Sequence, residues 1–261
     1  IAGGVESMSN VPRYLFTGRT KNQMYGDRTL MDGLSGTLTD AHVSGVFVER
    51  ASASDAPEVA LLLAGGHSHP WTLAQVEAIF SKSRKRGYKE DIKTWGQLGL
   101  TGDWANRPIS LYGRNSASGT YGFFKEIVLK NGDYKDTVKE QPGSASVVQG
   151  VTEDRYAIGY SGAGYRTSGV RAVPLAEQPA GPFFSGTYEE VVAGKYPLSR
   201  FLYVYVNRAP GKPLDPLPLE FLKLVMSREG QEVVVKDGYF PLTPAIVKEE
   251  LAKITGAAGT Q

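Results

Sequence analysis

The chain contains 261 residues, of which 41% are hydrophobic and 21% are charged, and its formal net charge is +2. This size and composition predict a globular protein with two domains. The small net charge gives no strong overall field for binding nucleic acid. The absence of cysteine excludes disulfides, thiolate metal sites and cysteine nucleophiles. No apolar run approaches the ~20 residues that a membrane-spanning helix needs.

The N-terminal part of the chain carries few signals of secondary structure. Glycine and serine are frequent over residues 1–50, and no helical period lasts. Residues 43–48 predict a short strand or helix. The apolar run Glu58–Ala64 is bounded by proline and glycine, and its pattern fits a buried strand as well as a short helix.

From Pro70 onward, helical and extended patterns alternate. Thr72 and Gln75 form a capping box in front of a helical apolar face. Residues 200–206 are apolar on both faces, as in a buried central strand. This alternation predicts an α/β fold. The other predicted elements, in chain order, are a turn region at 92–100, a strand at 108–112, a helix at 121–129, a helix start at 144–149, strands at 156–160 and 170–175, a helix ending near Gly194, and helices at 217–226 and 245–254. Residues 231–235 fit either a continued helix or an extended segment.

The most informative segment runs from Arg114 to Thr120, between a predicted strand and a predicted helix. A helix N-terminus carries unpaired N–H groups and a partial positive charge, so it attracts anions. Gly119 permits a close approach of the backbone, Ser118 and Thr120 add hydroxyl donors, and Arg114 offers a planar pair of donors. These residues predict an oxyanion site; the alternative is an ordinary helix cap beside a surface arginine.

The other groups of polar residues and motifs in the sequence indicate no catalytic, metal or nucleotide site. His67 and His69 are adjacent to a helix start, but no third metal ligand accompanies them. The run 159–163 lacks the final glycine of a serine nucleophile elbow. Nucleotide-binding fingerprints are missing as well, and the basic run 82–86 fits a solvated helix end. The sequence therefore predicts no catalytic residues, no metal and no cofactor.

Several longer stretches closely resemble the periplasmic phosphate-binding proteins of bacterial phosphate ABC transporters. The likeness covers about residues 70 to 250 of the chain. The matching stretches are Trp95–Gly102, Tyr112–Tyr121, Glu140–Gln149, Ile158–Ser161, Tyr196–Arg200 and Lys236–Leu242.

The resemblance implies an α/β Venus-flytrap fold of two domains, with a mixed sheet in each and the ligand in the cleft between them. Domain I would comprise residues 1–68 and 200–261, and domain II residues 69–199. The protein would bind inorganic phosphate and deliver it to a membrane ABC permease. It would work as a monomer in the periplasm or outside the cell, after removal of a signal peptide, without nucleic acid and without enzymatic activity.

The resemblance also implies a set of phosphate ligands. In domain II these are Arg114, Ser118, Gly119 and Thr120, which match the family's motif. In domain I, Asp55 matches the aspartate of the family's cleft. The expected hydroxyl of that domain belongs to either Ser35 or Thr37.

Residues 1–35 depart from the family pattern. The stretch Ala2–Pro12 resembles a thiolase segment, but thiolase chemistry needs a cysteine and the chain has none. The interval between Asp55 and the helix at Thr72 is also shorter than the family pattern. Domain I is therefore expected to be atypical or shortened.

Asp55 is the candidate for selectivity because hydrogen phosphate carries a proton that a carboxylate can accept. Fully ionised sulfate has no such proton and would face an unmatched acceptor, and a site of this kind can reject the wrong ligand strongly. The alternative for Asp55 is a helix N-cap or a turn aspartate before Pro57. The alternatives for the whole chain are a phosphatase-like enzyme that uses the same pocket, or a binder of another oxyanion.

Overall fold

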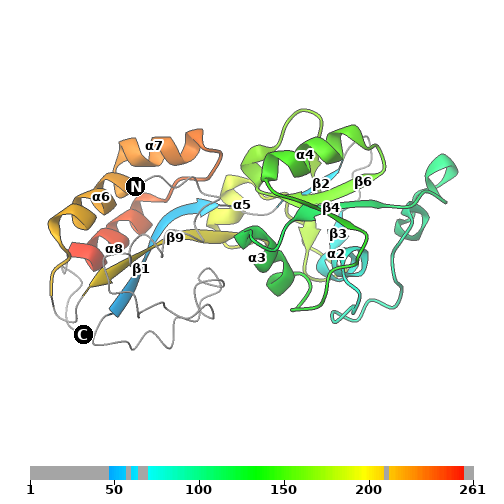
Figure 1. The fold of residues 1–261 in the computed structure, drawn as a ribbon, viewed down its shortest axis with the longest axis horizontal. Coiled ribbons are helices and arrows are strands. Elements are labelled where there is room, and N and C mark those ends of the chain that lie inside the picture. The colour runs from blue at the N-terminus through cyan, green and yellow to red at the C-terminus, as the bar shows by residue number, and fades with distance from the viewer. Residues whose placement is uncertain (1–46, 57–59, 64–69, 209–211, 256–261) are drawn as a thin grey trace, which may run out of the picture. The chain divides into compact units, whose positions relative to one another are not determined.

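The computed structural model describes residues 47–56, 60–63, 70–208 and 212–255 of the chain. The protein divides into two compact units (Figure 1). Unit 1 comprises residues 1–56 and 200–261, and unit 2 comprises residues 57–199. The chain therefore passes between the units after Ala56 and again after Ser199.

A five-stranded mixed sheet forms the centre of unit 2, in the order β5-β4-β6-β2-β7. Strand β4 is parallel to both of its neighbours, β5 and β6, whereas β2 is antiparallel to β6 and β7. A separate small sheet pairs β3 with β8 in parallel. The strands of this unit are β2 (Ala60–Leu63), β3 (Trp71–Thr72), β4 (Ser110–Arg114), β5 (Val138–Gln141), β6 (Ala157–Ser161), β7 (Arg171–Ala172) and β8 (Leu175–Ala176).

Helices connect the parallel strands of unit 2. Helix α3 links β4 to β5, and α4 links β5 to β6 on the far side of β4. Because such crossovers are right-handed and the two connections run in opposite directions, the helices lie on opposite faces of the sheet, as Figure 1 shows. The helices of this unit are α2 (Leu73–Phe80), α3 (Gly119–Ile127), α4 (Ser144–Glu153) and α5 (Tyr188–Val192), with 3₁₀ turns at Trp95–Leu98, Gly102–Trp104 and Ala163–Tyr165.

Aromatic rings join the sheet of unit 2 to two of its helices. Phe124 of α3 stacks on Tyr160 of β6 with ring centroids 4.0 Å apart. Phe80 of α2 meets both rings edge-on, at 5.3 and 5.7 Å. All three side chains are fully buried. Aromatic pairs in these geometries stabilise a core by more than the burial of their apolar area alone. These contacts therefore fix α3 against β6 and α2.

The described residues of unit 1 form an antiparallel pair of strands and three helices. β1 (Phe47–Ala56) pairs with β9 (Arg200–Arg208), from Phe47 opposite Arg208 to Ala56 opposite Arg200. The helices are α6 (Pro216–Met226), α7 (Arg228–Lys236) and α8 (Pro244–Thr255). Their core with β9 consists of Val206, Leu214, Leu222, Met226, Leu242 and Ile254.

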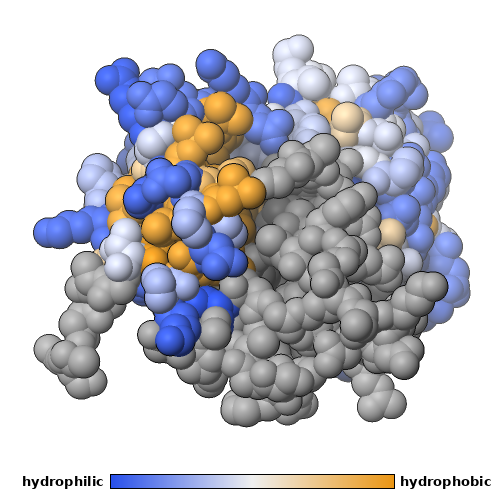
Figure 2. Space-filling model, turned by 60° about the vertical axis from the view of Figure 1, so that its left-hand side comes forward, coloured by the Kyte–Doolittle hydropathy of each residue, from blue (hydrophilic) through white to orange (hydrophobic). Residues whose placement is uncertain are grey.

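Helices α6 and α7 also present apolar side chains to the surface. Leu217 and Leu224 of α6, and Val233 and Val235 of α7, are each more than half exposed. Figure 2 shows apolar side chains gathered in one area among hydrophilic ones.

The prediction of an α/β fold with two domains is confirmed, and the predicted mixed sheet is present in unit 2. In the described part of unit 1 the sheet is antiparallel instead, because its two strands are β1 and β9 alone. The first passage between the units also lies before residue 57, whereas the sequence placed it at 68. The reason is that β2 pairs with β6 and β7, which draws residues 60–63 into the sheet of unit 2.

Two ambiguous stretches prove to be extended where they are described. Residues 60–63 of the run Glu58–Ala64 form β2, and residues 47–48 begin β1. The helix predicted after the Thr72 capping box is present as α2. The single strand predicted at 170–175 is interrupted near Pro174, so that it forms the two short strands β7 and β8.

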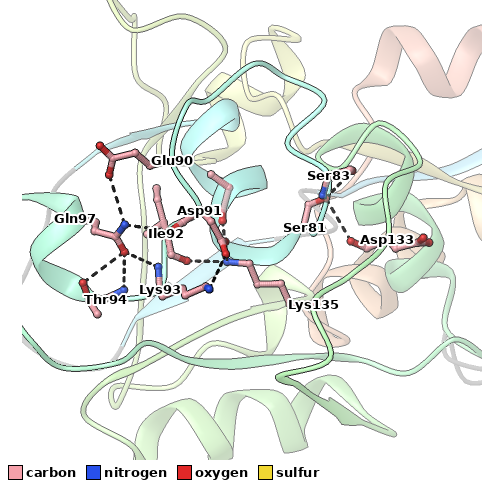
Figure 3. A network of polar contacts seen from close by, with 11 residues as sticks. Ser81, Ser83, Glu90, Asp91, Ile92, Lys93, Thr94, Gln97, Asp133 and Lys135 are labelled. Carbon is pink, nitrogen blue, oxygen red and sulfur yellow. Dashed lines mark hydrogen bonds and ion pairs between the residues drawn. The ribbon is translucent and has the colours of Figure 1, made fainter.

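A polar network ties the segment that follows α2 to the connection between α3 and β5 (Figure 3). The Lys135 ammonium group donates to the carbonyl oxygens of Ala78 and Ile92, at 2.9 and 2.7 Å, and forms a 2.6 Å ion pair with Asp91. Burial alone would raise the pKa of Asp91, but Lys135 and Lys93 outweigh it and hold that pKa below its ordinary value. Burial lowers the pKa of Lys135, against the opposing effect of Asp91.

Candidate functional site

The predicted oxyanion segment lies where β4 ends and α3 begins. Ser118 is the N-cap of α3: its hydroxyl accepts from the backbone N–H of Thr120 at 3.1 Å. The preceding turn is closed by a bond from the Ser118 N–H to the carbonyl oxygen of Asn115 at 3.0 Å. The first-turn N–H groups of a helix have no acceptor within it, so α3 directs donors toward the end of β4.

The Arg114 side chain is 4% exposed although it carries a permanent charge. One terminal nitrogen, Nη1, donates to the Ser144 hydroxyl at 2.8 Å, and Nη2 donates to the carbonyl oxygen of Pro142 at 3.2 Å. A guanidinium group has five N–H donors in a fixed plane. These contacts therefore fix its orientation at the carboxyl end of β4.

Ser144 and Ser161 extend the site to the neighbouring strands. Ser144 begins α4, directly after β5, and is 2% exposed. Ser161 ends β6, is fully buried, and donates from its hydroxyl to the carbonyl oxygen of Ser144 at 3.1 Å. The carboxyl ends of β5, β4 and β6 are adjacent. The connection after β4 leads to β5, whereas the connection after β5 leads back across β4 to β6. Such a switch point is where open α/β sheets bind ligands.

The hydroxyl of Thr120 is a further donor of the segment. Thr120 is 7% exposed, and within the described ranges its side chain forms no hydrogen bond. Gly119, beside it, is partly buried. The four domain II residues predicted as phosphate ligands thus lie together, around the start of α3. A cation, hydroxyl groups and a helix N-terminus together can bind a compact oxyanion.

The phosphate ligands predicted for domain I do not belong to the segment around Arg114. Asp55 lies in β1 with its backbone opposite Phe201, and nothing further is described of its side chain. Ser35 and Thr37 lie outside the described residues, as do His67 and His69. The roles of Asp55, Ser35 and Thr37 therefore stay predictions.

Sequence reasoning placed Ser144 at the start of a helix and did not include Ser144, Ser161, Tyr134 or Tyr160 among the phosphate ligands. The available signal was local, because Ser144 follows a glycine at the predicted helix start. The strand before it, β5, has the polar sequence Val-Lys-Glu-Gln and was not predicted as extended. Without β5 in the sheet, Ser144 could not be placed beside Arg114.

The basic run 82–86 has a structural role that was not predicted. Arg86 donates from Nε to the carbonyl oxygen of Val128 at 2.9 Å and from Nη2 to that of Ile127. Lys85 donates to the carbonyl oxygens of Lys130 and Asn131. These cations satisfy carbonyl groups at the C-terminal end of α3.

In the part of the chain that the structure describes, no group of three histidine, aspartate or glutamate side chains is placed to hold a metal ion. No described helix is both long enough and apolar enough to cross a membrane.

A family model described as a PBP superfamily domain matches residues 53–229. The phosphate-binding protein PstS of Pseudomonas aeruginosa is 59% identical over 185 residues, which cover 71% of this chain and 57% of that protein. The PstS of Staphylococcus haemolyticus is 28% identical over 180 residues, covering 67% and 54%. The chain thus spans little more than half the length of these curated relatives.

Solved structures show the same fold at low sequence identity. A structure from Planctomyces limnophilus, described as a possible phosphate binding protein, has a TM-score of 0.63 at 23% identity, covering 80% of this chain and 74% of its own. An ABC-type phosphate transport receptor from Vibrio cholerae has a TM-score of 0.57 at 17% identity, covering 77% and 74%.

Proposed function

The chain belongs to the PBP superfamily, and from that premise we propose that it binds inorganic phosphate and delivers it to a membrane ABC permease. The observation that carries the proposal is the buried Arg114 guanidinium beside the N-terminal turn of α3. The 59% identical relative from Pseudomonas aeruginosa is named a phosphate-binding protein, which favours phosphate among the oxyanions.

In this proposal each residue of the site has a separate role in binding phosphate. Arg114 supplies charge and paired donors, Ser118 and Gly119 shape the helix start, and the Thr120 hydroxyl donates to the anion. Asp55 of unit 1 accepts the proton of hydrogen phosphate and so disfavours sulfate. A hydroxyl of Ser35 or Thr37 completes the ligand set.

The proposed protein is a carrier and not an enzyme. A phosphatase needs a nucleophile, a base or a metal set beside the phosphate. The described residues around Arg114 supply hydrogen-bond donors and a cation, which bind an anion without attacking it. Membership of a binding-protein superfamily supports the same conclusion. We further propose that the protein works as a monomer, in the periplasm or secreted, without nucleic acid.

Titration calorimetry with phosphate and sulfate tests the proposal on protein freed of bound anions by unfolding and refolding. We expect one phosphate per chain and no heat from sulfate at the same concentrations. Arg114→Ala removes several charge-assisted hydrogen bonds and should weaken phosphate binding at least about 100-fold.

Arg155→Ala is the matched control, because Arg155 is exposed and stacks on Trp104 instead of facing the site. It should bind phosphate as the wild type does. Equal affinity of the Arg114→Ala variant and the wild type would remove the site from its assigned role. A tighter response to sulfate would favour another oxyanion. Release of phosphate from a monoester such as p-nitrophenyl phosphate would favour the phosphatase alternative.

A further inference from the structure

Two tyrosine hydroxyls connect both ends of the segment that carries the proposed phosphate ligands. The Tyr134 hydroxyl donates to the carbonyl oxygen of Tyr121, in the first turn of α3, at 2.9 Å. The Tyr160 hydroxyl donates to the Tyr134 hydroxyl at 3.0 Å and faces the carbonyl oxygen of Arg114, the last residue of β4, at 3.4 Å. The two tyrosines, called here the tyrosine pair, thus contact the backbone at both ends of the segment 114–121.

The tyrosine pair is held rigidly by its surroundings. Tyr160 is fully buried under the ring of Phe124, and its own ring is stacked with that of Tyr134 at 5.9 Å. The backbone around Tyr134 is fixed as well, because the N–H of Lys135 donates to the carbonyl oxygen of Phe80 at 2.8 Å. Burial raises the pKa of both tyrosines, so both hydroxyls keep their protons at neutral pH.

Gly113 shows how closely the Tyr160 side chain approaches β4. A Cβ atom at Gly113 would lie 2.7 Å from Cε1 and 2.9 Å from the hydroxyl oxygen of Tyr160. Contacts of this length do not occur between unbonded atoms of these types, so any larger residue at 113 would displace the tyrosine. The hydroxyl reaches the end of β4 only because position 113 lacks a side chain.

The carbonyl that Tyr160 faces is important because it fixes the plane of a peptide group. In a trans peptide the C=O and the following N–H point in opposite directions. The Arg114 carbonyl points toward Tyr160, and the N–H of Asn115 donates to the carbonyl oxygen of Gln141 at 3.0 Å. This peptide plane is therefore held from both neighbouring strands, which sets the direction in which the Arg114 side chain leaves β4.

We propose that the tyrosine pair positions the Arg114–Thr120 segment for its anion. It sets the separation between the guanidinium at the end of β4 and the donor groups in the first turn of α3, and it keeps two carbonyl oxygens turned away from the ligand. Tyr134 and Tyr160 touch no ligand in this role; they are positioning residues. The inference rests on the proposed function, since it deepens the account of the same site.

The test compares Tyr134→Phe, Tyr160→Phe and the double variant of the full chain with Tyr156→Phe. Tyr156 is the matched control because its ring packs on Trp104, and its hydroxyl forms no hydrogen bond within the described residues. Each variant keeps its ring, so the core stays filled. The readouts are amide hydrogen exchange of residues 115–122 without ligand, the dissociation constant for phosphate, and its dissociation rate.

We expect faster exchange of these amides in Tyr134→Phe and Tyr160→Phe, and phosphate affinity about 3- to 10-fold weaker through faster dissociation, as for a lost hydrogen bond. The double variant should lose less than the product of the two single effects, because the hydroxyls act on one segment. Tyr156→Phe should match the wild type in all three readouts.

Val191→Ala separates positioning from general loss of stability. Val191 is a buried core residue of α5, and its truncation should lower the melting temperature without touching the tyrosine pair. Affinity that falls as much in Val191→Ala as in the tyrosine variants would overturn the inference. So would unchanged amide exchange in the double variant. A wild type that binds no phosphate would sink the proposed function, and amide exchange would still decide the positioning role.

Discussion

Ser144 shows how much of the site depends on single side chains. Its hydroxyl accepts the 2.8 Å bond from Arg114, and its carbonyl accepts the bond from Ser161. A buried guanidinium needs its donors satisfied, because leaving such a group without a partner is costly. Ser144 therefore supports the orientation of the cation from the start of α4.

Replacing Ser144 by alanine should weaken phosphate binding about 3- to 10-fold, the effect of one hydrogen bond to a charged group. Ser146→Ala is the control in the same helical turn, where the side chain is only partly buried, and it should leave affinity unchanged. Calorimetric titration of both variants decides the matter. Equal affinities in the two variants would contradict a role for the Ser144 hydroxyl.

The connection from β4 into α3 was predictable because its signals are local. A serine N-cap, a glycine and a following helical period lie within a few residues of Arg114. The position of β5 depends on residues far away in the chain and was not predictable. This strand has a polar sequence without apolar alternation, and its extended form is visible only in its pairing with β4. The contribution of Ser144, and that of Tyr160 to the end of β4, follow only from the assembled sheet.

The C-terminal end of α3 depends on a contact that sequence alone did not indicate. The fully buried carboxylate of Glu77 in α2 accepts the backbone N–H groups of Lys85 and Arg86, each at 2.5 Å. This holds the turn that presents Arg86 to the last carbonyl groups of α3. Cations at a helix C-terminus interact favourably with its dipole, so α2 and α3 stabilise each other through this turn.

Arg86→Ala should lower the stability of unit 2 by about 1–2 kcal/mol, because two partly buried hydrogen bonds and a favourable charge are lost. All three tryptophans belong to unit 2, so their fluorescence during urea unfolding reports this unit. Lys82→Ala is the comparison: its ion pair with Asp136 is exposed and should contribute at most about 0.5 kcal/mol. Arg86→Ala with no larger effect than Lys82→Ala would refute the capping role.

At the scale of the whole molecule, the Lys135–Asp91 ion pair predicts how stability responds to acid. The pKa of Asp91 is lower in the folded protein than its ordinary value of 3.8. The folded state therefore binds fewer protons near that pH than the unfolded chain does. The stabilisation is complete above pH 3.8 and is lost as the pH falls through the lowered pKa.

Asp91→Asn should therefore flatten the loss of stability of unit 2 below about pH 4, and lower its stability at neutral pH by about 1 kcal/mol or less, since the carboxylate is partly exposed to solvent. Tryptophan fluorescence in urea, recorded between about pH 3 and pH 7, measures both effects. Asp136→Asn, at an exposed position, should preserve the wild-type acid response. An acid response of Asp91→Asn that equals the wild type would assign the pH dependence to other carboxylates.

Selectivity in the proposed function draws on both units of the molecule. The segment around Arg114 in unit 2 supplies donors, which attract phosphate and sulfate alike. Discrimination needs an acceptor that only a protonated anion satisfies, and Asp55 of unit 1 is the residue proposed for it. Its position in β1, one residue before the chain passes into unit 2, is described through its pairing with Phe201.

Asp55→Asn should reduce the ratio of phosphate to sulfate affinity at least about tenfold, because an amide carries no charge and can donate to an unprotonated oxyanion. Competition calorimetry with both anions measures the ratio directly. Asp215→Asn, at an exposed position before α6 of the same unit, is the control and should keep wild-type selectivity. If Asp55→Asn retains that selectivity too, Asp55 loses its assigned role and the preference for phosphate must come from other groups of the site.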